Sequence, residues 1–172
     1  VKDIPATALR QYYSKAGSDS NDGNDPNGFN LSGATFTNGT LTLTKTGAFA
    51  SYAHAAAIAP ERDIQRTNII YISGGTGVTV GWFRIASKVS NDAITLTANI
   101  GGTNPSNVTS STGPKLTVAE SGTPAARAFI QSNTAGEERF AFLRRGDTWV
   151  SAQAISSNGR ANRRVMAYGS GA

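Results

Sequence analysis

Residues 10–28 read RQYYSKAGSDSNDGNDPNG, and this stretch decides how the chain begins to fold. The aromatic pair at 12–13 gives residues 11–15 the character of a short strand. From 17 to 28 the chain is a dense run of Gly, Ser, Asp, Asn and Pro, the residue types that favour tight turns. We therefore predict a short strand that runs directly into a long irregular loop.

Outward from this loop, the pattern of apolar residues predicts a mainly β chain. Asn38-Gly39 lies between two alternating runs, which is a strong signal for a hairpin. Three β-branched runs follow, separated by turn residues at 74–77 and 90–92, so we expect a small antiparallel sheet or half-open barrel. The five strand candidates of this region are 34–36, 40–44, 68–73, 82–87 and 93–99.

The rest of the chain is more varied. Residues 48–59 are rich in Ala and stop at Pro60, which predicts one short helix. Residues 101–113 are polar and have the composition of a linker, and residues 125–132 have helical character. Three further strands are predicted at 139–143, 148–155 and 164–168.

The composition limits the class of protein. The 172 residues suit one domain or two small ones. The absence of cysteine excludes a disulfide scaffold and a thiolate metal site. No run approaches the roughly 20 apolar residues that cross a bilayer, so no membrane span is expected. The chain starts at Val1 and stops at Ala172, just after a predicted strand, and we expect further structure to adjoin it.

The net charge of +5 is concentrated near the C-terminus, where residues 121–172 hold seven Arg against three acidic residues. Such a cluster, with Arg163 and Arg164 at its centre, is one form of a polyanion-binding surface. The alternative is a solvated face or an interface to neighbouring structure. We do not expect a nucleic-acid partner.

One loop has the composition of an ion site. Asp19, Asn21, Asp22 and Asp25 offer the hard oxygen ligands that Ca²⁺ prefers, although their spacing does not match an EF-hand. The alternative is a cluster of Asx turns, in which these side chains accept hydrogen bonds from the loop's own backbone. Ca²⁺ is the one cofactor that the sequence suggests.

Nothing in the sequence assembles a catalytic constellation. His54 is the only histidine and has no second histidine or motif-flanked serine with which to form a metal site or a triad. Glu137-Glu138 and Asp147 do not have the arrangement of a glycosidase carboxylate pair, because adjacent side chains usually point apart. The Gly-rich residues 74–77 lack the ending of a phosphate loop, and we expect a hairpin turn there.

The sequence suggests a carbohydrate site around Trp149. An exposed indole stacks on sugar rings, and Arg144 and Arg145 would pair with acidic sugars. The alternative is that Trp149 fills a hydrophobic core.

Three stretches together resemble the pectate-lyase-like right-handed parallel β-helix proteins. Residues 12–23 (YYSKAGSDSNDG) are similar to the strand and loop that open the first coil of that family. Residues 142–149 (FLRRGDTW) resemble a later coil, and residues 158–159 and 167–172 resemble the rung that follows it. The family has one more residue between the positions of Tyr13 and Ser14, which affects the register of the first strand.

The resemblance implies three regions: a first strand and capping loop over 1–33, an inserted small β module over 34–114, and the first β-helix coils over 115–172. It implies a non-enzymatic structural or adhesion module of a virion fibre or a secreted surface protein, extracellular or in a virion. Such a module would associate with itself, with neighbouring coils or with a polysaccharide. The alternative is the N-terminal fragment of a secreted polysaccharide lyase or glycoside hydrolase whose active site lies further along.

Overall fold

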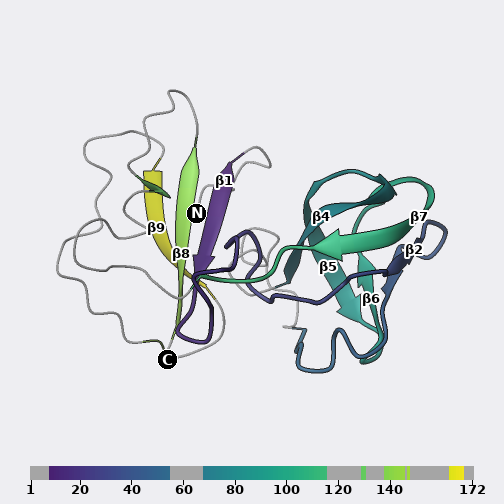
Figure 1. Cartoon of the computed structure of the whole chain (residues 1–172), viewed down its shortest axis with the longest axis horizontal. Coiled ribbons are helices and arrows are strands. Elements are labelled where there is room, and N and C mark those ends of the chain that lie inside the picture. The colour runs from purple at the N-terminus through teal and green to yellow at the C-terminus, as the bar shows by residue number, and fades with distance from the viewer. Residues whose placement is uncertain are drawn as a thin grey trace.

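The computed structural model describes residues 8–54, 68–115, 129–130, 138–145, 147 and 163–168. These residues form two sheets that lie side by side along the long axis of the molecule (Figure 1). One is a three-stranded parallel sheet of order β1-β8-β9, and the other is a six-stranded antiparallel sheet of order β2-β3-β6-β5-β4-β7. The mainly β prediction is confirmed. The strands are β1 Leu9–Tyr13, β2 Thr35–Thr37, β3 Thr42–Thr44, β4 Ile69–Val78, β5 Gly81–Lys88, β6 Ala93–Leu96, β7 Gly101–Ser110, β8 Arg139–Arg144 and β9 Arg163–Tyr168.

The antiparallel sheet curls until its two edge strands, β2 and β7, meet. The predicted hairpin around Asn38 is confirmed as β2 and β3, which pair antiparallel. The edges touch at a single bridge, where the Val108 N–H donates to the Ala34 carbonyl at 2.9 Å. The Asn38 side-chain amide adds a 2.6 Å hydrogen bond to the Gly102 carbonyl. The expected half-open barrel is therefore a nearly closed one.

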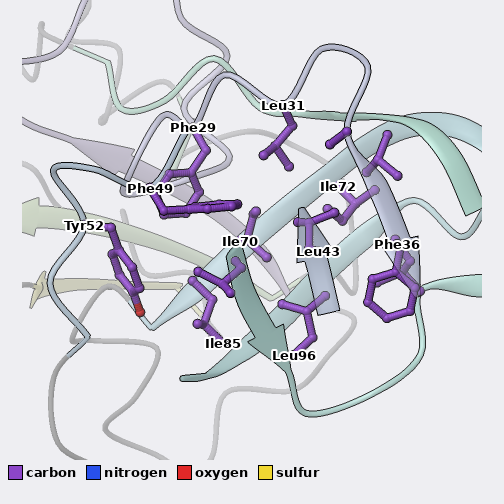
Figure 2. Close-up of a cluster of buried hydrophobic side chains, with 14 residues drawn as sticks. Phe29, Leu31, Phe36, Leu43, Phe49, Tyr52, Ile70, Ile72, Ile85 and Leu96 are labelled. Carbon is purple, nitrogen blue, oxygen red and sulfur yellow. The ribbon is translucent and has the colours of Figure 1, made fainter. Parts of the chain in front are cut away.

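Inward-pointing apolar side chains fill this barrel. On β3 the central Leu43 is fully buried between Thr42 and Thr44, which point outward. Ile70 and Ile72 of β4 enter the same core, as do side chains from the other strands (Figure 2). Burying each such side chain stabilises the fold by about 1.5–3 kcal/mol. The members from outside the strands are Phe29, Leu31, Ala34, Phe49, Tyr52 and Ile100.

Two segments predicted as turn and linker are strands. Residues 74–77 lie inside β4, and residues 101–110 form β7, which pairs with β4. The register between them shifts three times, and Asn104 and Asn107 adopt left-handed φ values of 48° and 50°. These strands are joined by backbone contacts between glycines and small polar residues rather than by apolar alternation. For that reason the hydrophobic pattern gave no signal for them.

The helix predicted over 48–59 is wrong for its described part. Residues 48–51 form turns, and no helix forms over 48–54. The Ala48 and Ala50 N–H groups donate to the carbonyl three residues back, whereas the Phe49 N–H donates to the Asn91 carbonyl. Phe49 and Tyr52 both pack edge-on against Phe29 in the barrel core, with ring centroids 5.1 and 5.4 Å apart. Burial of these rings outweighs the helix propensity of the Ala residues. Residues 55–59 lie outside the described residues.

The parallel sheet joins strands that are distant in sequence. Leu9 of β1 pairs with Arg139 of β8, and Arg139 pairs with Arg163 of β9, 24 residues later. The strands predicted at 139–143 and 164–168 are thereby confirmed as β8 and β9, and the strand predicted at 11–15 is confirmed for residues 11–13, since β1 ends at Tyr13. The strand predicted at 148–155 lies outside the described residues, as does most of the helical segment 125–132, of which residues 129–130 are helical.

One face of the parallel sheet packs against the outer face of the barrel. Ile69 of β4 is buried in the same cluster as Tyr12, Phe140 and Phe142, and Trp82 of β5 packs against its edge. In the sequence, all the barrel strands, β2 to β7, lie between β1 and β8 of the parallel sheet. An insertion over 34–114 would give this order. The division into regions 1–33, 34–114 and 115–172 remains a prediction.

Candidate functional site: the covered edge of strand β1

The outer edge of β1 is hydrogen-bonded by the protein's own chain. The Tyr12 N–H donates to the Gly23 carbonyl at 2.7 Å, and the Tyr12 carbonyl accepts from the Lys115 N–H at 2.9 Å. The Ser14 N–H donates to the Lys115 carbonyl at 2.8 Å. β1 therefore has β8 on one side and two other chain segments on the other. An edge strand whose outward groups are satisfied in this way cannot template pairing with another chain.

The cover is made by two segments that are fastened to each other. The first is the Asp-rich loop over 17–23, and the second is residues 111–115, which leave the barrel after β7. The Gly23 N–H donates to the Gly113 carbonyl at 3.0 Å, and the Lys115 ammonium donates to the Asn21 carbonyl at 2.7 Å. The Asn21 side-chain amide donates to the Pro114 carbonyl at 2.9 Å. We call these two segments the edge cover.

Glycine is required where residues 17–28 approach residues 111–115. A Cβ on Gly17 would collide with the carbonyls of Pro114 and Lys115. Gly28 has a left-handed φ of 66°, and a Cβ there would lie 3.1 Å from the Thr112 carbonyl. The run of turn residues in the opening stretch therefore allows a close backbone approach as well as tight turns.

Two of the four predicted Ca²⁺ ligands, Asp22 and Asp25, accept hydrogen bonds from the protein itself. The Asp22 carboxylate accepts from the Asn24 N–H at 3.1 Å and from the Ser111 hydroxyl. One Asp25 oxygen accepts from the Asn27 N–H at 2.7 Å, which is an Asx turn, as the alternative interpretation expected. Asp19 is exposed. Across the described ranges, no three His, Asp or Glu side chains lie close enough together to share a metal ion.

Asp25 is the most unusual titratable group of this region. Its side chain is fully buried, and its second oxygen accepts the Tyr71 N–H of β4 at 2.7 Å. Burial raises the pKa of Asp25 to about 7, and the hydrogen bonds from the N–H groups of Tyr71, Asn27 and Gly28 oppose that rise. The composition of the loop predicts only an ion ligand at Asp25, and no pattern in the sequence indicates its burial.

The Arg residues proposed as a polyanion site do not form one cluster. Arg163 and Arg164 lie at the start of β9, whereas Arg144 and Arg145 lie at the end of β8. The parallel strands place these two pairs about five residues apart along the sheet, roughly 16 Å. Trp149 lies outside the described residues, so the carbohydrate site around it remains a prediction.

The inner face of the parallel sheet carries aromatic side chains aligned across the strands. Tyr12 stacks on Phe142 with ring centroids 4.8 Å apart, and Tyr168 meets Tyr12 edge-on at 5.2 Å. Burial raises the pKa values of both Tyr12 and Tyr168 above the ordinary value for tyrosine. These rings have packing roles in the described structure.

Arg10 and Trp82 are partners that the sequence did not indicate. The Arg10 guanidinium is almost completely buried and lies 4.8 Å from the centre of the Trp82 ring. Desolvation lowers the pKa of Arg10 from its ordinary value. No pattern in the sequence links these positions, because they are brought together only when the barrel packs on the parallel sheet.

A shallow groove of about 350 Å³ lies beside the edge cover. The hydroxyl groups of residues 110–112 already have partners: Ser110 donates to the Phe29 carbonyl, Ser111 donates to Asp22, and Thr112 accepts from the Asp22 N–H at 3.0 Å. The groove therefore offers little polar specificity for a ligand. It is lined by Gly28, Phe29, Asn30, Leu31, Ser32 and residues 109–112.

The other residues that the sequence analysis considered for catalysis contact different parts of the structure. His54 lies beside Tyr52, whose hydroxyl is 3.1 Å from its Nδ1. Asp147 accepts the Lys15 N–H at 2.7 Å, near the covered end of β1. Glu138 contributes its carbonyl to Leu9, while Glu137 lies outside the described residues.

No family model matches the chain, and no curated protein or solved structure matches it either. Over the described ranges we find no helical segment with the length and hydropathy that a membrane crossing requires. The interpretation of the chain therefore depends on its own geometry.

Proposed function

We propose that this chain is a structural module that begins a parallel β-helix, in a virion fibre or a secreted surface protein. The observation that favours this function is the difference between the two edges of the parallel sheet. The outer edge of β1 is hydrogen-bonded to the edge cover. Among the described residues, β9 pairs only with β8 and so has one edge toward which the sheet can grow.

The register of the sheet supports the same function. All six residue pairs between β8 and β9 are 24 residues apart, from Arg139 with Arg163 to Arg144 with Tyr168. A constant offset of this size fits one solenoid coil of about 20 to 25 residues. Coils of this kind stack so that the same face of every strand is buried. The rings of Tyr12 on β1 and Phe142 on β8 stack on each other in this way.

The direction of growth follows from the order of the strands. β1, β8 and β9 are neighbours in the order in which they occur along the chain, so each new strand is added on the side away from the edge cover. A further parallel strand would therefore pair with β9. We propose that this strand comes from a neighbouring coil or from a second copy of the chain.

The cover is tested by removing one of its hydrogen bonds. Lys115→Pro removes the N–H that donates to the Tyr12 carbonyl, whereas Lys115→Ala keeps that N–H and loses only the ammonium contacts. We expect light scattering to show concentration-dependent self-association of Lys115→Pro, with Lys115→Ala behaving like the parent protein. If Lys115→Pro is folded and no more associated than Lys115→Ala, the cover does not protect the edge and the proposed function fails.

A further inference from the structure

The loop over 24–28 lies between the two sheets and binds the barrel through a buried carboxylate. Asp25 accepts the N–H groups of Asn27 and Gly28 within the loop, at 2.7 and 3.3 Å. Its other oxygen accepts the Tyr71 N–H on β4, at 2.7 Å. Since Asp25 is fully buried, removal of its carboxylate would leave these three N–H groups without their acceptor.

Two further hydrogen bonds join the same loop to the barrel. The Asn27 side-chain amide donates to the Ile69 carbonyl of β4 at 2.9 Å. The Trp82 indole N–H of β5 donates to the Asn24 carbonyl at 2.8 Å. The loop is thus bound to both strands of the barrel that face the parallel sheet.

On its other side the loop is continuous with the edge of β1. Gly23, the residue before the loop, accepts the Tyr12 N–H of β1. Arg10 of β1 lies over the ring of the same Trp82 that binds the loop. The loop and the aromatic contact therefore connect β1 to β4 and β5 by separate routes.

We propose that the loop over 24–28, centred on Asp25, is a rigid joint that fixes the orientation of the barrel on the parallel sheet. A barrel tethered only by flexible chain would swing, because segments that make few buried contacts open at low free energy. Here the tether makes three side-chain hydrogen bonds to the barrel, and the carboxylate that forms one of them is sealed from water. The joint is independent of the proposed function, since it concerns these two sheets whatever adjoins β9.

The chain has no cysteine, so two labels can be placed without interference. Thr44→Cys on the outer face of β3 and Val165→Cys on β9 both replace exposed side chains. Spin labels at these positions measure the distance between barrel and sheet by pulsed electron resonance. We expect a single narrow distance distribution in the otherwise unchanged protein, and a distribution at least twice as wide after Asp25→Ala.

Asp92→Ala is the matched control. The Asp92 carboxylate also accepts a backbone N–H, that of Gly47 at 2.6 Å, but both residues belong to the barrel region. This variant should leave the distance distribution narrow. Equal broadening by Asp92→Ala and Asp25→Ala would overturn the joint, because the effect would then follow general loss of stability.

A second variant keeps the test decisive if Asp25→Ala does not fold. Trp82→Phe keeps an aromatic ring against Arg10 and removes the hydrogen bond to the Asn24 carbonyl. We expect a smaller broadening, with amide exchange of β4 and β8 unchanged because each sheet stays folded. A narrow distribution in every folded variant of Asp25 and Trp82 would show that these contacts do not set the orientation.

Discussion

The barrel and the parallel sheet are held together by contacts of different range. In the barrel, three of the five strand pairings, β2 with β3, β4 with β5 and β5 with β6, cross short connections, and only β3 with β6 and β4 with β7 pair over longer stretches. In the parallel sheet, β8 pairs with β9 at an offset of 24 residues. β1 pairs with β8 although the whole barrel lies between these two strands in the sequence. Local pairing closes small loops and costs little entropy, whereas the parallel sheet must hold distant segments in register. The edge cover and the buried aromatic side chains hold that register.

The largest expected effect tests the core of the parallel sheet. Phe142→Ala removes a fully buried ring that stacks on Tyr12, and it should lower the free energy of unfolding by about 3–5 kcal/mol. Urea denaturation followed by circular dichroism measures this change. Val165→Ala on the neighbouring strand is the control, since that side chain is 40% exposed. A loss below 1 kcal/mol would mean that this stack does not stabilise the sheet.

The matching change in the barrel is Leu43→Ala. Leu43 is fully buried at the centre of the short strand β3, and a cavity there should cost about 2–5 kcal/mol in urea denaturation. Thr44→Ala, on the outer face of the same strand, should cost less than 1 kcal/mol. Similar losses for the two variants would contradict the inward orientation of Leu43.

The pH dependence of stability tests the burial of Asp25. Its pKa is raised by burial to about 7 in the folded protein, above the ordinary 3.8, so the unfolded chain releases its proton first as the pH rises. The contribution of Asp25 to the free energy of unfolding should therefore fall between about pH 4 and pH 7 and stay constant above. The slope is at most about 1.4 kcal/mol per pH unit.

Urea midpoints measured from pH 4 to pH 8 separate this slope from that of the other acids. Asp25→Asn should remove the contribution of Asp25, and Asp19→Asn, at an exposed position of the preceding Asp-rich loop, should leave it in place. Parallel pH profiles for the parent protein and Asp25→Asn would contradict the raised pKa.

The contact between β4 and β7 gives a smaller effect with a close control. Gly101→Ala would place a Cβ against the Gly77 carbonyl and should cost about 1–3 kcal/mol. At Gly102 the same carbonyl would be 3.7 Å away, an ordinary contact, so Gly102→Ala should be nearly neutral. Thermal unfolding measures both. Equal melting temperatures for the two variants would show that these strands do not approach as closely as described.

The smallest effect concerns the seam of the barrel. Asn38→Ala removes the hydrogen bond to the Gly102 carbonyl and should cost about 0.5–1.5 kcal/mol. Amide exchange should quicken at Val108, whose N–H closes the seam at Ala34, and should stay unchanged at Leu43 inside the sheet. Unchanged exchange at Val108 would mean that the Asn38 side chain does not help to close the barrel.

The sequence predicts the strands that alternate apolar and polar residues or combine β-branched side chains. Phe36 and Leu43 belong to runs of this kind, and the hairpin between them follows from its turn residues. The apolar pattern does not predict β7, where Asn104 and Asn107 take left-handed backbone angles. It also fails at Phe49, whose burial depends on rings that arrive from distant segments.

The candidate site could be located from the sequence, but its role could not be derived. Composition identifies the turn-rich loop, yet the polar composition of residues 101–113 predicts a linker and not the partner of that loop. That partnership depends on the path of the chain through the barrel, which brings Lys115 back to Tyr13. The burial of Asp25 arises in the same way, because β4 reaches it only after the barrel has formed.

The central claim is the proposal that the edge cover closes the parallel sheet at β1, whereas β9, which pairs only with β8 among the described residues, can accept a further strand. Residue-resolved amide exchange of the monomeric protein measures both edges at once. We predict strong protection of the Tyr12, Ser14 and Lys115 amides, and rapid exchange of those β9 amides that do not pair with β8. Rapid exchange at Tyr12 and Ser14, or strong protection of every β9 amide in the monomer, would contradict it.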